Sequence, residues 1–130
     1  MALVSPTLPK FHKTIRKGTM DINTVRTGGV LVIKAEGRID GSNSADFLGS
    51  IQAVIDDDDT GVVLDFGGID YISSAGLRVI LLLAKELRGT NTGFGICSLS
   101  SAVQEIFSIS GFDQIITVSD TEEQAVKSLQ

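Results

Sequence analysis

The sequence predicts a single α/β domain whose mixed, mostly parallel β-sheet has four to five strands and about four helices. Three observations predict this fold class. The chain has 130 residues, which suits one compact domain. Gly28 and Gly29 separate two short apolar runs, a pattern typical of an antiparallel hairpin. After the hairpin, strand-like and helix-like segments alternate, which favours right-handed crossovers and parallel strands.

The predicted elements follow one another in the order ββαβαβαβα. Strands are expected at residues 22–27, 30–35, 61–66, 93–99 and 115–118. Helices are expected around residues 47–55, 77–87 and 103–107, and a last one, capped by Asp120 or Thr121, carries Ala125, Val126 and Leu129. The polar segment 40–44 offers side chains to cap the first helix, and Gly67-Gly68 is expected to end the third strand.

Composition and charge exclude several classes of protein. With 42% hydrophobic and 21% charged residues, the chain is ordinary for a globular domain and unlike a disordered one. Its longest apolar run, residues 79–84, is far shorter than the roughly 20 residues of a membrane-spanning helix. The single cysteine, Cys97, cannot form an internal disulfide and fits a cytoplasmic setting. The net charge of −5 argues against nucleic acid as a direct partner.

The first twenty residues differ in composition from the rest. They contain both prolines, four basic residues and no acidic residue. We therefore expect residues 1–20 to be a basic, flexible extension ahead of a domain at residues 21–130. Two alternatives stay open: a basic arm for a membrane or nucleic acid, and sequence upstream of a start at Met20.

Residues that could support catalysis are few. The only histidine, His12, lies in the extension, so the domain has no Ser-His or Cys-His pair. Metal-ligand spacings of Cys and His and a phosphate-binding loop are also missing from the sequence. The run 56–59 of four aspartates is interpreted as a solvated loop, with adventitious cation binding as the alternative. Cys97 is interpreted as a buried apolar residue. We expect no enzyme activity, no metal and no cofactor.

One segment, residues 70–78, places two hydroxyl groups where a strand ends and a helix begins. The structural interpretation is that Ser73 or Ser74 caps the helix, a contribution of about 1 kcal/mol, and that Gly76 permits close packing. The functional interpretation is that an exposed serine at a helix N-terminus accepts a phosphate, which the free N–H groups and the helix dipole favour. The residues alone leave both interpretations open.

The same segment resembles a known family. Leu64-Asp65-Phe66 followed by residues 69–78 resembles the signature of STAS domains, in particular of bacterial anti-sigma factor antagonists, and residues 37–40 resemble the segment before the family's first helix. The resemblance covers roughly residues 20–130. It implies partner switching: the unphosphorylated protein binds an anti-sigma factor that is also a serine kinase and so releases the sigma factor. Phosphorylation of a serine turns binding off, and a serine phosphatase reverses it.

The resemblance also implies site residues. The family's motif reads Asp-Ser-Ser/Thr-Gly-Leu, which places the phosphoacceptor on Ser74, with Ser73 in the aspartate position as the second choice. The implied partner-binding surface comprises Asp40, Ser42, Ser73, Ser74, Ala75, Gly76, Leu77 and Arg78. Two alternatives have different partners: an unphosphorylated STAS subunit bound to the ATPase of a lipid-transport complex, and a domain that binds a small ligand or nucleotide.

Overall fold

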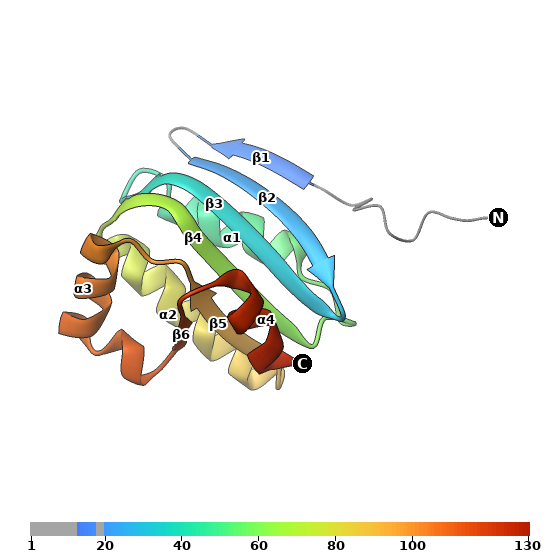
Figure 1. The fold of residues 1–130 in the computed structure, drawn as a ribbon. Coiled ribbons are helices and arrows are strands. Elements are labelled where there is room, and N and C mark those ends of the chain that lie inside the picture. The colour runs from blue at the N-terminus through green and yellow to red at the C-terminus, as the bar shows by residue number, and fades with distance from the viewer. Residues whose placement is uncertain (1–12, 18–19) are drawn as a thin grey trace.

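The computed structural model describes residues 13–17 and 20–130, which form one six-stranded sheet with helices on both faces (Figure 1). The strands are β1 (Lys13–Lys17), β2 (Met20–Thr27), β3 (Val30–Ile39), β4 (Gly61–Ile72), β5 (Gly93–Cys97) and β6 (Thr117–Ser119). The helices are α1 (Ser44–Val54), α2 (Ser74–Gly89), α3 (Ser101–Ser110), the short 3-10 helix η1 (Phe112–Gln114) and α4 (Glu122–Leu129).

The sheet is mixed and its strands lie in sequence order. β1, β2 and β3 pair antiparallel, and β3, β4, β5 and β6 pair parallel. The α/β class, the mostly parallel sheet and the order ββαβαβαβα from β2 onward are therefore confirmed. β1 is an additional strand inside the segment expected to be an extension, so the sheet has six strands where four to five were expected. Residues 1–12, with His12, and 18–19 lie outside the described residues.

The hairpin between β2 and β3 forms as predicted. Gly28 and Gly29 have φ angles of 56° and 87°, and a two-residue turn between twisted strands requires such positive values. Along β2, alternate residues point into the protein, and Met20 and Ile22 are each only 1% exposed. The hairpin thus adds an antiparallel edge to a parallel sheet.

β3 and β4 run further than the sequence predicted. β4 continues through Gly67 and Gly68, and its last residue, Ile72, pairs with Ile39 at the end of β3. A Cβ atom on Gly68 would lie 2.6 Å from Cγ of Glu36, so glycine allows the two strands to approach here. The expectation that the two glycines end the strand was wrong, because the neighbouring parallel strand holds the chain extended.

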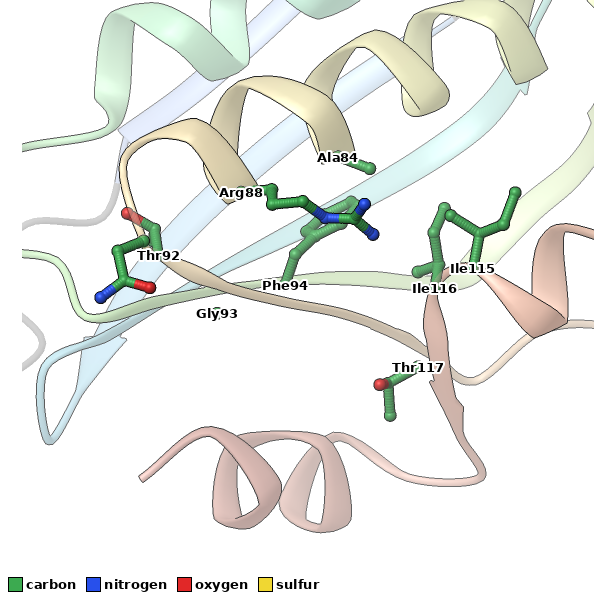
Figure 2. Close-up of a pocket in the computed structure, with 9 residues that line it drawn as sticks. Ala84, Arg88, Thr92, Gly93, Phe94, Ile115, Ile116 and Thr117 are labelled. Carbon is green, nitrogen blue, oxygen red and sulfur yellow. The ribbon is translucent and has the colours of Figure 1, made fainter.

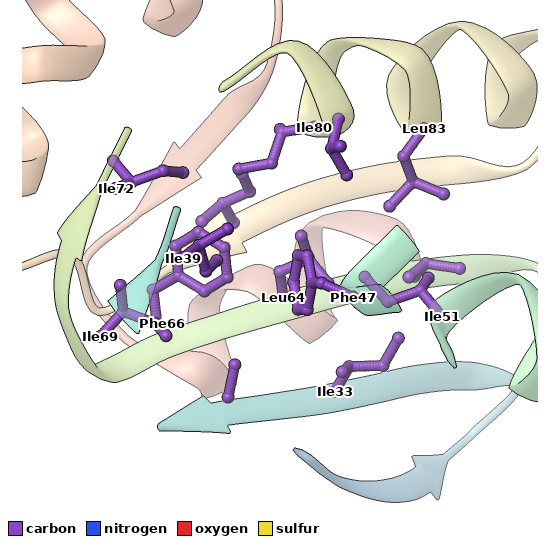
Figure 3. Close-up of a cluster of buried hydrophobic side chains, with 14 of the residues drawn as sticks. Ile33, Ile39, Phe47, Ile51, Leu64, Phe66, Ile69, Ile72, Ile80 and Leu83 are labelled. Atoms are coloured by element: carbon purple, nitrogen blue, oxygen red, sulfur yellow. The ribbon is translucent and has the colours of Figure 1, made fainter. Parts of the chain in front are cut away.

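Two apolar clusters fill the space between the sheet and its helices. The larger one lies beneath α1, α2 and α3, where Phe47 and Phe66 have ring centroids 6.3 Å apart (Figure 3). The smaller one lies under α4 on the opposite face and consists of Val30, Val32, Val63, Cys97, Ala125 and Val126.

Thr121 caps α4 by accepting a hydrogen bond from the Gln124 N–H at 3.2 Å, which decides between the two predicted caps.

The acidic run is only partly a solvated loop. Asp59 is buried, and its carboxylate accepts hydrogen bonds from Nε and Nη2 of Arg26 at 2.8 and 2.9 Å and from the Asp56 N–H at 2.8 Å. Burial opposes ionisation of Asp59, but these bonds outweigh it and lower its pKa. For Asp59 the solvated interpretation was wrong, because the guanidinium of Arg26 compensates the buried charge. Asp57 and Asp58 are exposed.

Candidate functional site

The candidate site lies where β3 and β4 end and α1 and α2 begin. The carboxyl ends of parallel strands meet at one edge of the sheet, where α/β proteins commonly place their functional groups. The main-chain N–H of Ser73 donates to the carbonyl of Ile39 at 2.9 Å, so the start of α2 is fixed to the end of β3. The loop at residues 40–43 therefore lies beside the two serines.

Ser73 is the N-cap of α2. Its backbone is extended, and its Oγ accepts a hydrogen bond from the Gly76 N–H at 3.2 Å. Its carbonyl accepts the first helical hydrogen bond, from the Leu77 N–H at 2.9 Å. The capping interpretation of the sequence is confirmed for Ser73, whose half-buried hydroxyl is engaged in holding the helix start.

Ser74 is the first helical residue and is exposed. Its hydroxyl forms no hydrogen bond with any described residue. The N–H groups at the start of an α-helix have no partner within the helix, and the helix dipole makes this end electropositive. A negatively charged group on the Ser74 hydroxyl would therefore lie in a favourable field.

Gly76 explains how the helix start can lie so close to the two strands. The residue is buried, and a Cβ atom on it would lie 2.7 Å from Cγ1 of Ile72 and 2.8 Å from Cγ2 of Ile39. Gly76 thus lies beneath the predicted partner-binding surface and supports it from inside. Leu77 is half-buried against the core, and Arg78 is exposed one turn after Ser74.

The loop before α1 is organised by Asp40. Its Oδ1 accepts hydrogen bonds from the N–H and Oγ of Ser42 at 2.9 and 2.6 Å. Its Oδ2 lies 3.1 Å from Nε of Arg38. The hydrogen bonds from Ser42 and the charge of Arg38 hold the pKa of Asp40 below its ordinary value. Asp40 and Ser42, both predicted partner-binding residues, therefore form one ordered turn.

Asn43 shows why no side chain caps α1. Its Oδ1 accepts from the Asp40 N–H at 2.9 Å, and its Nδ2 donates to the carbonyl of Arg38 at 2.8 Å. Asn43 occupies the cap position of α1 without a side-chain cap bond. The predicted side-chain cap from this segment was wrong, because these groups stabilise the turn instead.

The predicted partner-binding residues did not include Arg38, Asp70 and Tyr71. A register shift between Gly37 and Arg38 sets Arg38 opposite Tyr71. Together with Gly37 and Asp70 they line a groove of about 430 Å³, and Tyr71 is 51% exposed. The sequence signal that could have found the groove is the chain's one tyrosine, placed directly before Ile72 and the two serines.

A second pocket, of about 410 Å³, lies at the other end of α2, between that helix, β5 and β6. Figure 2 shows Arg88 reaching over Phe94 toward Ile115 and Ile116. The lining residues are Ala84, Arg88, Asn91, Thr92, Gly93, Phe94, Ile115, Ile116 and Thr117. These described lining residues include no histidine, cysteine or carboxylate and no phosphate-binding loop.

Cys97 is buried under α4, and burial, together with the nearby carboxylates of Asp65 and Glu122, raises the pKa of its thiol to about 11. The apolar interpretation of Cys97 is confirmed. Among residues 13–17 and 20–130, no group of three His, Cys, Asp or Glu side chains could hold a metal ion. The helices within the same range all lack the length or the apolar character that a membrane span requires.

Comparison with known proteins decides the family. The family model of the STAS domain matches residues 21–125. The chain belongs to the STAS domain family. It is 39% identical over 114 residues to BtrV of Bordetella bronchiseptica, designated an anti-sigma factor antagonist, and the match covers 88% of this chain and 95% of BtrV. This relative and the family model place the STAS domain described here among the anti-sigma factor antagonists, a family of non-catalytic proteins.

Solved structures of antagonists share the fold. An anti-sigma factor antagonist from Mycobacterium paratuberculosis has a TM-score of 0.78 at 24% identity, over 85% of this chain and 93% of that one. The Bacillus cell fate determinant SpoIIAA, solved in a phosphorylated form, has a TM-score of 0.63 at 20% identity, over 84% and 99% of the two chains. At these identities the likeness concerns the fold.

Proposed function

We propose that this STAS domain is an anti-sigma factor antagonist that acts by partner switching, with Ser74 as the phosphoacceptor. In its unphosphorylated form it binds a cytoplasmic anti-sigma factor with serine kinase activity, and the sigma factor is released. Phosphorylation of Ser74 ends this binding, and a serine phosphatase restores it. The proposal rests above all on one observation, the exposed hydroxyl of Ser74 at the first residue of α2.

The geometry favours Ser74 over Ser73 as the acceptor. The Ser73 hydroxyl is half-buried and accepts the cap hydrogen bond from Gly76, so a kinase would have to break that contact. The Ser74 hydroxyl is exposed and has no hydrogen bond with a described residue that modification would break. A phosphate on Ser74 can therefore change the surface while α2 keeps its cap.

Electrostatics explain how one phosphate could end binding. Phosphorylation adds about −1.5 to −2 charges. A kinase must hold the phosphates of ATP against the acceptor hydroxyl. The surface of the partner opposite Ser74 therefore accommodates an uncharged serine next to an anionic nucleotide. A phosphate on Ser74 would be repelled by the phosphates of that bound nucleotide and would lose its solvation. Since about 1.4 kcal/mol is tenfold in affinity, a penalty of a few kcal/mol weakens binding by two or three decades.

A serine at position 73, where the family motif has an aspartate, changes the charge beside the phosphoacceptor but keeps the helix cap on which the switch depends. The resemblance puts an aspartate at this position in most antagonists, and aspartate and serine are both good N-caps. Ser73 keeps the cap bond to Gly76 at 3.2 Å. What the serine removes is one negative charge next to the acceptor, so a phosphate on Ser74 meets less repulsion from its own chain.

The decisive experiment uses the anti-sigma factor kinase that the proposal assigns to this chain as its partner. Incubation with that kinase and ATP should add one phosphate, which mass spectrometry should assign to Ser74. Ser74→Ala should abolish the addition, and Ser101→Ala, which changes another exposed serine at a helix start, should not. Phosphate found only on Ser73, or none added to the wild-type chain, would contradict the proposal.

Affinity purification with the unphosphorylated chain distinguishes the proposed partner, an anti-sigma factor, from the alternative partner, a transporter ATPase. Recovery of a serine-kinase-like anti-sigma factor supports the proposal, and its loss after phosphorylation supports the switch. Recovery of a transporter ATPase in its place would support the alternative of a STAS subunit in a transport complex.

A further inference from the structure

We infer that the Tyr71 groove, lined by Gly37, Arg38, Asp70 and Tyr71, receives a basic side chain of the anti-sigma factor. The inference rests on the proposed function and concerns the same partner, but it involves residues outside the predicted surface. It follows from the shape of the ends of β3 and β4, from the charges at the groove and from its position relative to Ser74.

The groove is built by the part of β3 and β4 that extends beyond β5. β5 pairs with β4 only as far as Asp65, whereas β3 and β4 continue together to Ile39 and Ile72. Two register shifts interrupt this extension, and Gly37 takes a φ angle of 112°, which side chains rarely tolerate. Bulges of this kind redirect side chains near functional sites. Here they place Arg38 beside Tyr71.

Among the described residues that line the groove, the only charge without a partner is negative. Arg38 is paired with Asp40 at 3.1 Å. Asp70 is exposed, and its carboxylate forms no ion pair and no side-chain hydrogen bond with the residues that the structure describes. An uncompensated carboxylate therefore stands next to the exposed ring of Tyr71.

This combination fits an arginine or lysine side chain. The aliphatic part of such a side chain packs on an aromatic face, and its cationic head is attracted by the ring and by a nearby carboxylate. Tyrosine is also enriched among the residues that contribute most to protein interfaces. A groove of about 430 Å³ offers room for one such side chain.

The position of the groove identifies the partner. Tyr71 lies three residues before Ser74, and the Ser73 main chain is bonded to Ile39, the residue after Arg38. The groove therefore lies close to the surface that a protein covers when it reaches the Ser74 hydroxyl. Asp58 provides a matched control, because it is exposed in the loop after α1, and parallel strands place that loop at the opposite edge of the sheet.

The test measures binding of the full, unphosphorylated chain to its anti-sigma factor by calorimetry. Asp70→Asn should weaken binding about tenfold and reduce its dependence on salt, because one attractive charge is lost. Tyr71→Ala should weaken it by about tenfold or more, and Tyr71→Phe, which keeps the ring, should stay within about threefold. Asp58→Asn should stay within about twofold of the wild type.

The outcomes separate this inference from the proposed function. If the wild-type chain binds no anti-sigma factor, the proposed function fails and the inference fails with it. If the wild type binds and phosphorylation abolishes binding, but Asp70→Asn and Tyr71→Ala bind like the wild type, the inference alone is overturned. It is also overturned if these variants change self-association of the chain and leave the affinity for the anti-sigma factor unchanged.

Discussion

The starts of α2 and α3 have nearly the same local chemistry. Ser73 and Ser100 are both N-caps with extended backbones, and each Oγ accepts a hydrogen bond from the N–H three residues later, at 3.2 Å in both cases. Each cap is followed by an exposed serine, Ser74 and Ser101. Judged by these residues alone, the two helices present equivalent hydroxyl groups.

Their surroundings differ. The start of α2 is bonded to Ile39 and packed through Gly76 against both strands, with the Asp40 turn and the Tyr71 groove beside it. The start of α3 follows a connection in which Ser98 has a φ angle of 65°, and its third helical residue is the buried Val103. The comparison shows that a capping pattern in the sequence identifies where a helix begins. Whether that helix start can act as a recognition surface depends on the elements packed around it.

The largest effect expected from this comparison is on partner binding. Ser74→Asp places a permanent negative charge where the phosphate would stand and should weaken the complex with the anti-sigma factor by about tenfold or more. Ser101→Asp adds the same charge at the start of α3 and should change the affinity by less than about twofold. Calorimetry of both variants tests this, and equal effects would show that the two starts are equivalent.

The next effect concerns the close approach that only α2 makes. Gly76→Ala adds a methyl group against Ile39 and Ile72 and should lower the free energy of unfolding by about 1–3 kcal/mol. Gly89→Ala, at the end of the same helix, meets nothing within 4 Å and should raise it by up to about 1 kcal/mol. Urea denaturation measures both. A Gly76→Ala variant as stable as the wild type would mean that the strands yield to the methyl group.

The caps themselves should behave alike. Ser73→Ala and Ser100→Ala each remove one cap hydrogen bond and should each lower the free energy of unfolding by about 1 kcal/mol. Denaturation of the two variants side by side checks this. A much larger loss at Ser73 would indicate that its hydroxyl supports the strand ends as well as the helix.

The smallest effect is a local titration. The pKa of Asp40 is lowered from its ordinary value of 3.8, so the turn it organises is intact above that value and is lost as the pH falls through the lowered pKa. The amide resonance of Ser42 should therefore shift with a midpoint below 3.8, and that of Val103 should show no matching step. A Ser42 midpoint above the ordinary value would contradict the hydrogen bonding of the turn.

Much of the fold and part of the site could be predicted from the sequence. The two-glycine hairpin, the alternation of strands and helices, and the serine cap of α2 depend on neighbours in the chain, so local patterns reveal them. The extension of β4 to Ile72 and the burial of Asp59 depend on partners about thirty residues away, Glu36 and Arg26, which no local pattern specifies.

The Tyr71 groove escaped prediction for the same reason. Strand periodicity places alternate residues on opposite faces, but Asp70 and Tyr71 are both exposed between the buried Ile69 and Ile72. The register shifts between β3 and β4 accompany this break in alternation, and they arise from pairing across the sheet. The position of Ser74 could be predicted, whereas the surface beside it required the three-dimensional structure.

The smaller core cluster under α4 gives the molecule a built-in reporter. Thiol reagents react with the ionised form, and Cys97 is both covered by α4 and hard to ionise, with a pKa of about 11. An alkylating agent can thus modify this single cysteine only in molecules whose last helix has lifted from the sheet or whose domain has unfolded. The rate of labelling therefore reports how often such openings occur, and no additional probe has to be attached.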